Sequence, residues 1–141
     1  MSGPDVLIDT NVFVSARNRS ESGRAACARL LDLVDEGKVH AVVSTISLAE
    51  LRAGMSPAEA KNVWQAFVSH LLASPNYEVA PVDLAVAEAA GEIRQRSRLT
   101  LPDALILATG QLRAVECVVT QDRQFGRAQT DLEVRSPDKV G

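Results

Sequence analysis

The stretch Val6-Leu7-Ile8-Asp9-Thr10-Asn11 contains three apolar residues in a row, followed at once by an acid. The apolar run is typical of a short, buried strand. In an open α/β sheet, ligands bind in the crevice beyond the carboxyl ends of the strands. We therefore expect Asp9 to lie at a binding site if this strand is central, unless its carboxylate only caps the turn that follows.

The composition indicates one compact domain without an overall basic field. A chain of 141 residues is long enough to bury roughly two-thirds of its unfolded surface, and 46% hydrophobic residues are too many for a disordered chain. The formal net charge is −3, yet 12 of the 15 cations are Arg, which suits bidentate contacts with phosphate. The same Arg content is equally consistent with the codon usage of a GC-rich genome.

Cysteine and hydropathy patterns bear on the compartment. Cys27 and Cys117 form no C-x-x-C pair and lie in apolar surroundings, which predicts buried free thiols. Residues 1–5 have neither the basic region nor the apolar run of a signal peptide, and no segment approaches the ~18 apolar residues that span a bilayer. We expect a cytoplasmic protein that does not enter a membrane.

Strand-like and helix-like stretches alternate along the chain. We expect strands at residues 6–8, 39–43, 77–80, 116–120 and 132–134, the last at an edge. We expect helices at 11–16, 24–36, 45–53, 56–73, 83–96 and from 102, and in the fourth of these the inward-facing residues Val63, Trp64, Phe67, Val68 and Leu71. The alternation predicts an α/β fold, a single α/β/α sandwich over residues 1–141 with a mostly parallel, four- to five-stranded sheet.

Four acids occur where a predicted strand ends or a predicted helix begins: Asp9, Glu50, Asp103 and Asp122. Each has an ordinary structural alternative, such as a capping box between Ser47 and Glu50 or favourable interaction of Asp103 with a helix dipole. Because parallel strands end at one edge of a sheet, the four are also expected to converge, and clustered carboxylates need cations nearby. Oxygen ligands favour Mg²⁺ or Mn²⁺ over zinc.

Other catalytic chemistries find less support. His40 begins a strand and His70 lies in a helix, neither beside a Ser or Cys nucleophile, so we interpret both as structural. The chain has no Gly-x-Ser-x-Gly elbow, Walker loop or Rossmann fingerprint. A carboxylate–metal site remains, to which Asn11 and Thr120 would add a neutral oxygen or a hydrogen-bonding group.

Four motifs in the chain resemble those of PIN-domain proteins, and specifically of the VapC toxins of bacterial toxin–antitoxin pairs. The matching segments are Leu7-Ile8-Asp9-Thr10-Asn11, Ser47-Leu48-Ala49-Glu50, Leu101-Pro102-Asp103-Ala104, and Val119-Thr120-Gln121-Asp122 with Phe125. They span nearly the whole chain in the family's order. Each motif is weak alone, and the ordered set of four carries the resemblance.

The resemblance implies a compact α/β/α fold and a Mg²⁺- or Mn²⁺-dependent ribonuclease that cleaves RNA phosphodiester bonds. It implies an acidic metal centre formed by Asp9, Glu50, Asp103 and Asp122. Thr120 would orient this site and Asn11 would hold neighbouring groups. Our hypothesis makes Asp9 and Asp103 the principal ligands, with Glu50 acting through water on the nucleophile and Asp122 completing the shell.

The resemblance also implies partners. Family members usually form homodimers and are silenced by a cognate antitoxin, here one similar to VapB, whose tail covers the acidic groove. Contact with operator DNA would occur only through that antitoxin. Where many relatives carry a further acid, this chain has Gln124, which favours one tightly held ion with a second recruited by the substrate phosphate.

RNA needs local cations to approach an acidic groove. Two groups of arginines lie near the motifs: Arg17, Arg19 and Arg24 follow the first motif, and Arg94, Arg96 and Arg98 precede the third. As phosphate contacts they would make binding salt-dependent, although solvated helix faces explain them equally well. Two other functions remain open at this point: a PIN nuclease that is not a toxin, and a catalytically silent PIN-like module that binds a protein.

Overall fold

The sheet contains five parallel strands, and β1 lies at its centre. A computed structural model of the chain describes residues 3–18, 22–122, 125 and 131–141. The strands are β1 (Asp5–Ile8), β2 (His40–Ser44), β3 (Tyr77–Ala80), β4 (Cys117–Val119) and β5 (Glu133–Arg135). Their order in the sheet is β3-β2-β1-β4-β5, and each neighbouring pair is parallel. The predicted α/β architecture and the predicted edge position of the last strand are confirmed.

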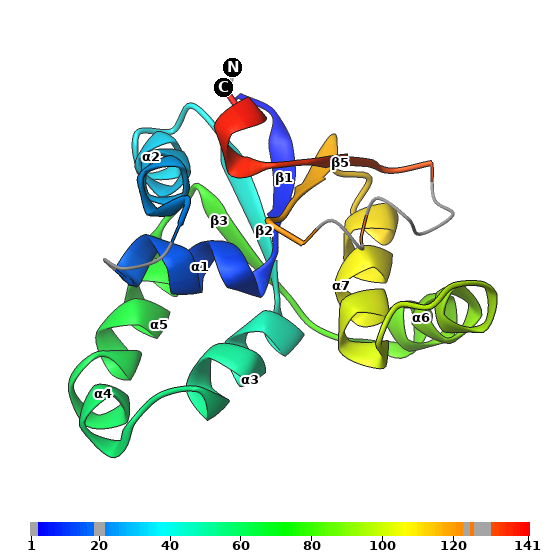
Figure 1. Cartoon of the computed structure of the whole chain (residues 1–141), viewed down its shortest axis with the longest axis horizontal. Helices are drawn as coiled ribbons and strands as arrows, with labels where there is room; N and C mark the ends of the chain where they lie inside the picture. The colour runs from blue at the N-terminus through cyan, green and yellow to red at the C-terminus, as the bar shows by residue number, and fades with distance from the viewer. Residues whose placement is uncertain (1–2, 19–21, 123–124, 126–130) are drawn as a thin grey trace.

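Helices cover both faces of this sheet (Figure 1). They are α1 (Thr10–Arg17), α2 (Arg24–Asp35), α3 (Thr45–Ala53), α4 (Pro57–Asn62), α5 (Trp64–Ala73), α6 (Leu84–Arg96), α7 (Leu101–Leu112) and the short 3₁₀ helix η2 (Pro137–Lys139). Figure 1 shows α1, α2 and α5 on one side of the strands and α6 and α7 on the other. Among the described residues, no helix is long and apolar enough to cross a membrane.

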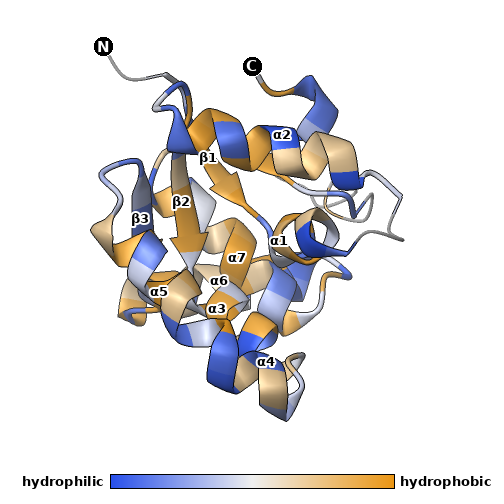
Figure 2. Cartoon of the chain, turned by 90° about the vertical axis from the view of Figure 1, so that its left-hand side faces the viewer, coloured by the Kyte–Doolittle hydropathy of each residue, from blue (hydrophilic) through white to orange (hydrophobic). Residues whose placement is uncertain are grey.

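The side chains of β1 alternate between the two layers, as the twofold period of a strand requires. Val6 and Ile8 pack into the cluster that α1 and α2 complete, whereas Leu7 packs into the cluster formed with α6 and α7. All three are fully buried. Figure 2 shows the apolar strands β1 and β2 among helices that carry both hydrophobic and hydrophilic residues. β1 is apolar throughout because it is covered on both faces.

The helix predicted over residues 56–73 is wrong as one element, because it breaks at Val63. Val63 ends α4 and precedes α5, with a backbone φ of −113° that departs from helical geometry. No residue of α4 is buried, while α5 buries Leu71 and half-buries Trp64 and Phe67. One straight helix could not follow the surface along α4 and also pack against the core along α5. Val63 itself is 38% exposed instead of facing inward.

The helix starts follow the predicted capping chemistry with one exception. Ser56 and Glu59 form the expected capping box at α4. At α3 the cap is Ser44, whose side chain accepts from the amide of Ile46 at 3.1 Å. The alternative capping box between Ser47 and Glu50 is therefore wrong, because both residues lie inside α3. Cys27 and Cys117 are buried free thiols, as expected.

Two helical glycines offer a matched test of how tightly α7 packs on the sheet. A Cβ at Gly91 in α6 would meet nothing within 4 Å, so Gly91→Ala should raise the free energy of unfolding by about 0.5–1 kcal/mol through helix propensity alone. A Cβ at Gly110 in α7 would lie 3.0 Å from Leu132 and 3.3 Å from Leu7 and Val115. Gly110→Ala should therefore lower the free energy of unfolding by about 1 kcal/mol, because the cost of overpacking outweighs the gain in helix propensity.

Urea unfolding of Gly91→Ala, Gly110→Ala and the wild type measures the two changes in the free energy of unfolding. Stabilisation by Gly110→Ala would contradict the close packing of α7 against β1.

Candidate active site

The carboxylate of Asp9 is buried at the end of β1 and held by three donors. The side chain caps α1 by accepting from the amide of Thr10 at 2.8 Å, and the residue is 4% exposed. The other oxygen accepts from the hydroxyl of Thr120 at 2.7 Å and from the amide group of Asn11 at 3.2 Å. The backbone amide of Asp9 donates to the carbonyl of Val119 at 3.0 Å, so β1 and β4 end side by side.

Asn11 and Thr120 link the start of α1 to the segment after β4. The Asn11 amide group lies 3.1 Å from the Thr120 hydroxyl, and its oxygen accepts from the backbone amide of Gln121 at 3.1 Å. The Thr120 hydroxyl accepts from the backbone amide of Asp122 at 2.9 Å. Both side chains were predicted to lie beside the acids. Asn11 and Thr120 donate to the Asp9 carboxylate, and Thr120 also accepts from the backbone of Asp122.

Glu50 is presented by α3, on the helix that follows β2. One of its carboxylate oxygens accepts from the hydroxyl of Thr10 at 2.7 Å, across 40 positions of sequence. The sequence did not single out Thr10, although it lies between Asp9 and Asn11 in the opening motif. Glu50 is exposed and, since the predicted capping box is absent, it has no capping role at α3.

Asp103 is presented by the first turn of α7, where Thr100 is the cap. Its backbone amide donates to the Thr100 hydroxyl at 3.3 Å. Burial raises the pKa of Asp103 above its usual value, and the negative charges of Asp122 and Glu50 raise it further. The helix start thus explains the position of Asp103, but it does not remove the repulsion from neighbouring acids.

The pKa of Asp9 shows the same electrostatic strain. Burial raises it from 3.8 to about 6, although the hydrogen bonds from Thr120 and Thr10 favour the charged form. The charges of Asp103 and Glu50 contribute a smaller part of the same rise. The charge of Glu50 thus acts on both Asp9 and Asp103, the charge of Asp103 acts on Asp9, and that of Asp122 acts on Asp103.

The donor chemistry of this group fits a hard divalent cation. Carboxylate and hydroxyl oxygens are the ligands that Mg²⁺ and Mn²⁺ prefer, and a cation would relieve the repulsion that raises both pKa values. In the part of the chain that the structure describes, no group of three or more His, Cys, Asp or Glu side chains is set closely enough to hold a metal ion. The fit is therefore one of charge and donor type, without a closed coordination shell.

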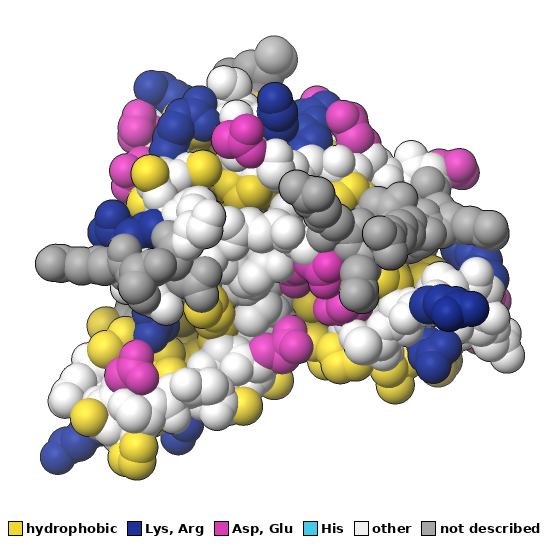
Figure 3. Space-filling model, in the orientation of Figure 1, with side chains coloured by type: hydrophobic (Ala, Val, Ile, Leu, Met, Phe, Trp, Pro, Cys, Tyr) yellow, Lys and Arg dark blue, Asp and Glu magenta, His cyan; other side chains and the backbone are white. Residues whose placement is uncertain are grey.

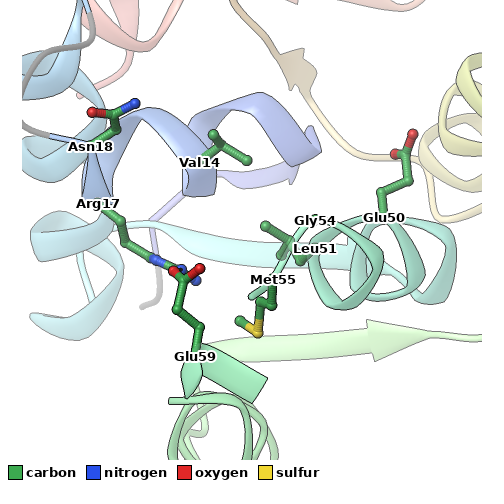
Figure 4. Close-up of a pocket in the computed structure, with 8 residues that line it drawn as sticks. All are labelled: Val14, Arg17, Asn18, Glu50, Leu51, Gly54, Met55 and Glu59. Atoms are coloured by element: carbon green, nitrogen blue, oxygen red, sulfur yellow. Dashed lines mark hydrogen bonds and ion pairs between the residues drawn. The ribbon is translucent and has the colours of Figure 1, made fainter. Parts of the chain in front are cut away.

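Two hollows flank the acids. One has a volume of about 400 Å³ and lies between α1, α3 and α4, with Glu50 at one end and the ion pair between Arg17 and Glu59 at the other (Figure 4). The second, of about 610 Å³, lies between the start of α2 and β5 and is lined by Thr120 and Asp122. Figure 3 shows acidic side chains near the middle of this face and Lys and Arg side chains toward its periphery.

The structure describes five of the six arginines predicted to contact RNA. Arg17 is 3.0 Å from Glu59, Arg24 begins α2, and Arg94 donates to the carbonyl of Ser97 at 3.4 Å. Arg96 and Arg98 are exposed ahead of α7. Arg19 and Gln124 lie outside the described residues. A role in RNA binding stays a prediction for all six arginines.

The two histidines pair with acids away from the carboxylate group. Nε2 of His70 is 2.9 Å from Asp35, and Nδ1 of His40 lies 3.1 Å from Asp5 without hydrogen-bond geometry. These positions agree with the structural interpretation of both residues.

Comparisons with known proteins address the family. Residues 6–130 match the sequence profile of the PIN domain. No curated protein matches the sequence. The fold is similar to that of VapBC2 from Rickettsia felis bound to a DNA fragment from their promoter, with a TM-score of 0.71, 22% identity, and coverage of 94% of this chain and 98% of that one.

Two further solved structures share the fold over almost their full length. FitAcB from Neisseria gonorrhoeae has a TM-score of 0.68 and 26% identity, over 96% of this chain and 99% of that one. VapC20 from Mycobacterium tuberculosis, a toxin that cleaves the sarcin–ricin loop, has a TM-score of 0.66 and 16% identity, over 88% of this chain and 95% of that one. The chain therefore belongs to the PIN domain family, and it has the fold of VapBC toxin–antitoxin proteins.

Proposed function

We propose that this protein is a metal-dependent endoribonuclease and the toxin of a VapBC-like, type II toxin–antitoxin pair that acts on cytoplasmic RNA. The observation that carries the proposal is the raised pKa of both Asp9 and Asp103, to which burial and the charges of acids from distant parts of the chain contribute. Membership of the PIN domain family and the fold shared with a toxin that cleaves an RNA loop support the same function.

The metal, Mg²⁺ or Mn²⁺, would be held by Asp9 and Asp103, with Asp122 completing the shell and Glu50 acting through water. When bound, such an ion would activate water and neutralise the charge that develops on the phosphate. The chain's own residues would orient these ligands. Thr120 and Asn11 fix the Asp9 carboxylate, and the Thr10 hydroxyl holds one oxygen of Glu50.

The partner would be an antitoxin similar to VapB, and operator DNA would be contacted through that antitoxin by a homodimer of this chain. Support comes from the solved VapBC2 structure, which contains promoter DNA, and from the hollow beside Glu50. Leu51 and Met55 line that hollow next to the Arg17–Glu59 ion pair, so it offers both apolar and charged contacts to a bound segment.

A catalytically silent PIN-like module is less consistent with the geometry. In such a module the acids would act only as caps. Asp9 and Asp103 do occupy helix starts, but Glu50 lies inside α3 and faces Thr10. Metal-dependent RNA cleavage would distinguish a nuclease from such a module. Inhibition of that cleavage by an antitoxin would distinguish a toxin from another PIN nuclease.

Cleavage of single-stranded RNA should require a divalent ion and the acidic group. Asp103→Asn should reduce kcat by about 10²-fold or more, because it removes a principal ligand of the ion that would activate water. Asp32→Asn, an exposed position on α2, is the matched control and should cleave at the wild-type rate. Gel assays of a labelled RNA with Mg²⁺, Mn²⁺ or EDTA give the readout. Cleavage that persists in EDTA, or none with either ion, would contradict the proposal.

The free energy of unfolding of the metal-free protein should fall as the pH rises from about 4 to 6. In this window the unfolded chain releases the Asp9 proton, with a pKa of 3.8, while the folded protein retains it up to about pH 6. The difference corresponds to at most about 3 kcal/mol of stability lost above pH 6.

Asp9→Asn should flatten this pH dependence and raise stability at pH 7 by about 1–3 kcal/mol, while cleavage is lost. Thermal unfolding in EDTA from pH 4 to 8 measures the slope, and added Mg²⁺ or Mn²⁺ should raise the Tm of the wild type but not that of the variant. If Asp9→Asn is instead less stable than the wild type at pH 7, its role as the cap of α1 dominates.

A further inference from the structure

The side chain of Gln121 connects three segments that are far apart in sequence. Its oxygen accepts from the buried hydroxyl of Ser15 in α1 at 2.6 Å, across 106 positions. Its nitrogen donates to the carbonyl of Ser22, just before α2, at 3.3 Å. Its backbone amide donates to Asn11, which also contacts Asp9. The residue between Thr120 and Asp122 is therefore attached both to the acidic group and to the start of α2.

Gly23 shows how closely the Gln121 side chain and the start of α2 fit together. Gly23 precedes α2 with a φ of +82°, a left-handed conformation that favours glycine. A Cβ at this position would overlap the side-chain nitrogen of Gln121. The Gln121 carboxamide thus occupies the space that any other residue at position 23 would fill, and the two positions constrain each other.

These contacts form one wall of the second hollow described above. Gly23 and Ala26 line it from α2, while Gln121 and Asp122 line it from the segment after β4. A volume of about 610 Å³ is in the range of sites that hold a small ligand or a single nucleotide. Since Asp122 belongs to the acidic group, a strand whose phosphate lies at the acids would extend into this hollow.

We propose that Gln121 is a positioning residue, which holds the start of α2 against the acidic group and so sets the width of the hollow that receives the RNA strand beside the cleaved phosphate. The inference rests on the proposed ribonuclease function and deepens it. Gln121 contacts neither the phosphate nor the ion. Its loss therefore changes how tightly RNA binds and leaves the chemical step intact.

The test compares kcat and KM for Gln121→Met, which keeps the length of the side chain and removes both of its side-chain hydrogen bonds. We expect KM to rise roughly 3- to 10-fold, since each lost bond is worth a few-fold in affinity, with kcat within twofold of the wild type. Gln95→Met, at an exposed position of α6, is the control of the same chemistry and should leave both constants unchanged.

A second pair of variants perturbs the same contact from the opposite side. Gly23→Ala and Gly37→Ala both place alanine at a φ near +80°, so both carry the same backbone strain. Only Gly23→Ala displaces the Gln121 side chain, because a Cβ at Gly37 would lie 3.8 Å from its nearest neighbour. We expect Gly23→Ala to raise KM as Gln121→Met does, and Gly37→Ala to lower stability without changing KM.

Two measurements that need no turnover complete the design. In an Asp103→Asn background, fluorescence anisotropy with a labelled single-stranded RNA should show Gln121→Met weakening binding by the same factor as KM. Hydrogen exchange should show faster exchange of the amides of residues 22–27 in Gln121→Met. Together they connect the loosened start of α2 to the loss of RNA affinity.

The outcomes separate this inference from the proposed function. An active wild type whose KM is unchanged by Gln121→Met, or whose kcat falls instead, would overturn the positioning role. An equal rise of KM in Gly23→Ala and Gly37→Ala would also overturn it, since strain alone would then explain the effect. A wild type that neither cleaves nor binds RNA would overturn the proposed function and, with it, this inference.

Discussion

The buried carboxylate of Asp9 is the constraint on which both the fold and the site depend. A carboxylate removed from water needs hydrogen bonds, and its three side-chain and backbone donors come from Thr10, Asn11 and Thr120. Those donors fix where α1 starts and where β4 ends. They do not fully offset burial, because the pKa of Asp9 is still raised to about 6. In the proposed function a bound divalent cation would offset this unfavourable balance, because a nearby positive charge favours the ionised carboxylate.

The order of the strands explains why the other acids reach the same place. β1 lies between β2 and β4, so the segments that leave these three neighbouring strands begin at one edge. Asp122 arrives directly after β4, and Glu50 arrives on α3 after β2. Asp103 comes from α7, which approaches β1 so closely that a Cβ at Gly110 would lie 3.3 Å from Leu7. The packing of α7 on the central strand is thus also what places Asp103.

Most of the fold and the group of acids could be predicted from local patterns, because apolar periodicity and chain reversals are local properties. The break at Val63 could not, since it depends on α5 having a core to face while α4 has none. The choice of Ser44 over Ser47 as a cap depends on where β2 ends. The contact of Gln121 with Ser15 joins residues 106 positions apart, and no local pattern signals such a pair.

Apolar packing and polar contacts hold different parts of the site in place. Asp9 and Asp122 follow strands that are buried on both faces, and moving them would disturb fully buried side chains such as Leu7 and Val119. Helix α1 packs into the core through Val12 and Phe13. Its polar side chains add the Arg17–Glu59 ion pair and the Ser15–Gln121 hydrogen bond. Each such contact contributes only about 1 kcal/mol. The position of Asp9 is therefore fixed by the core, while the hollows beside the acids are bounded in part by polar contacts that can change without loss of the fold.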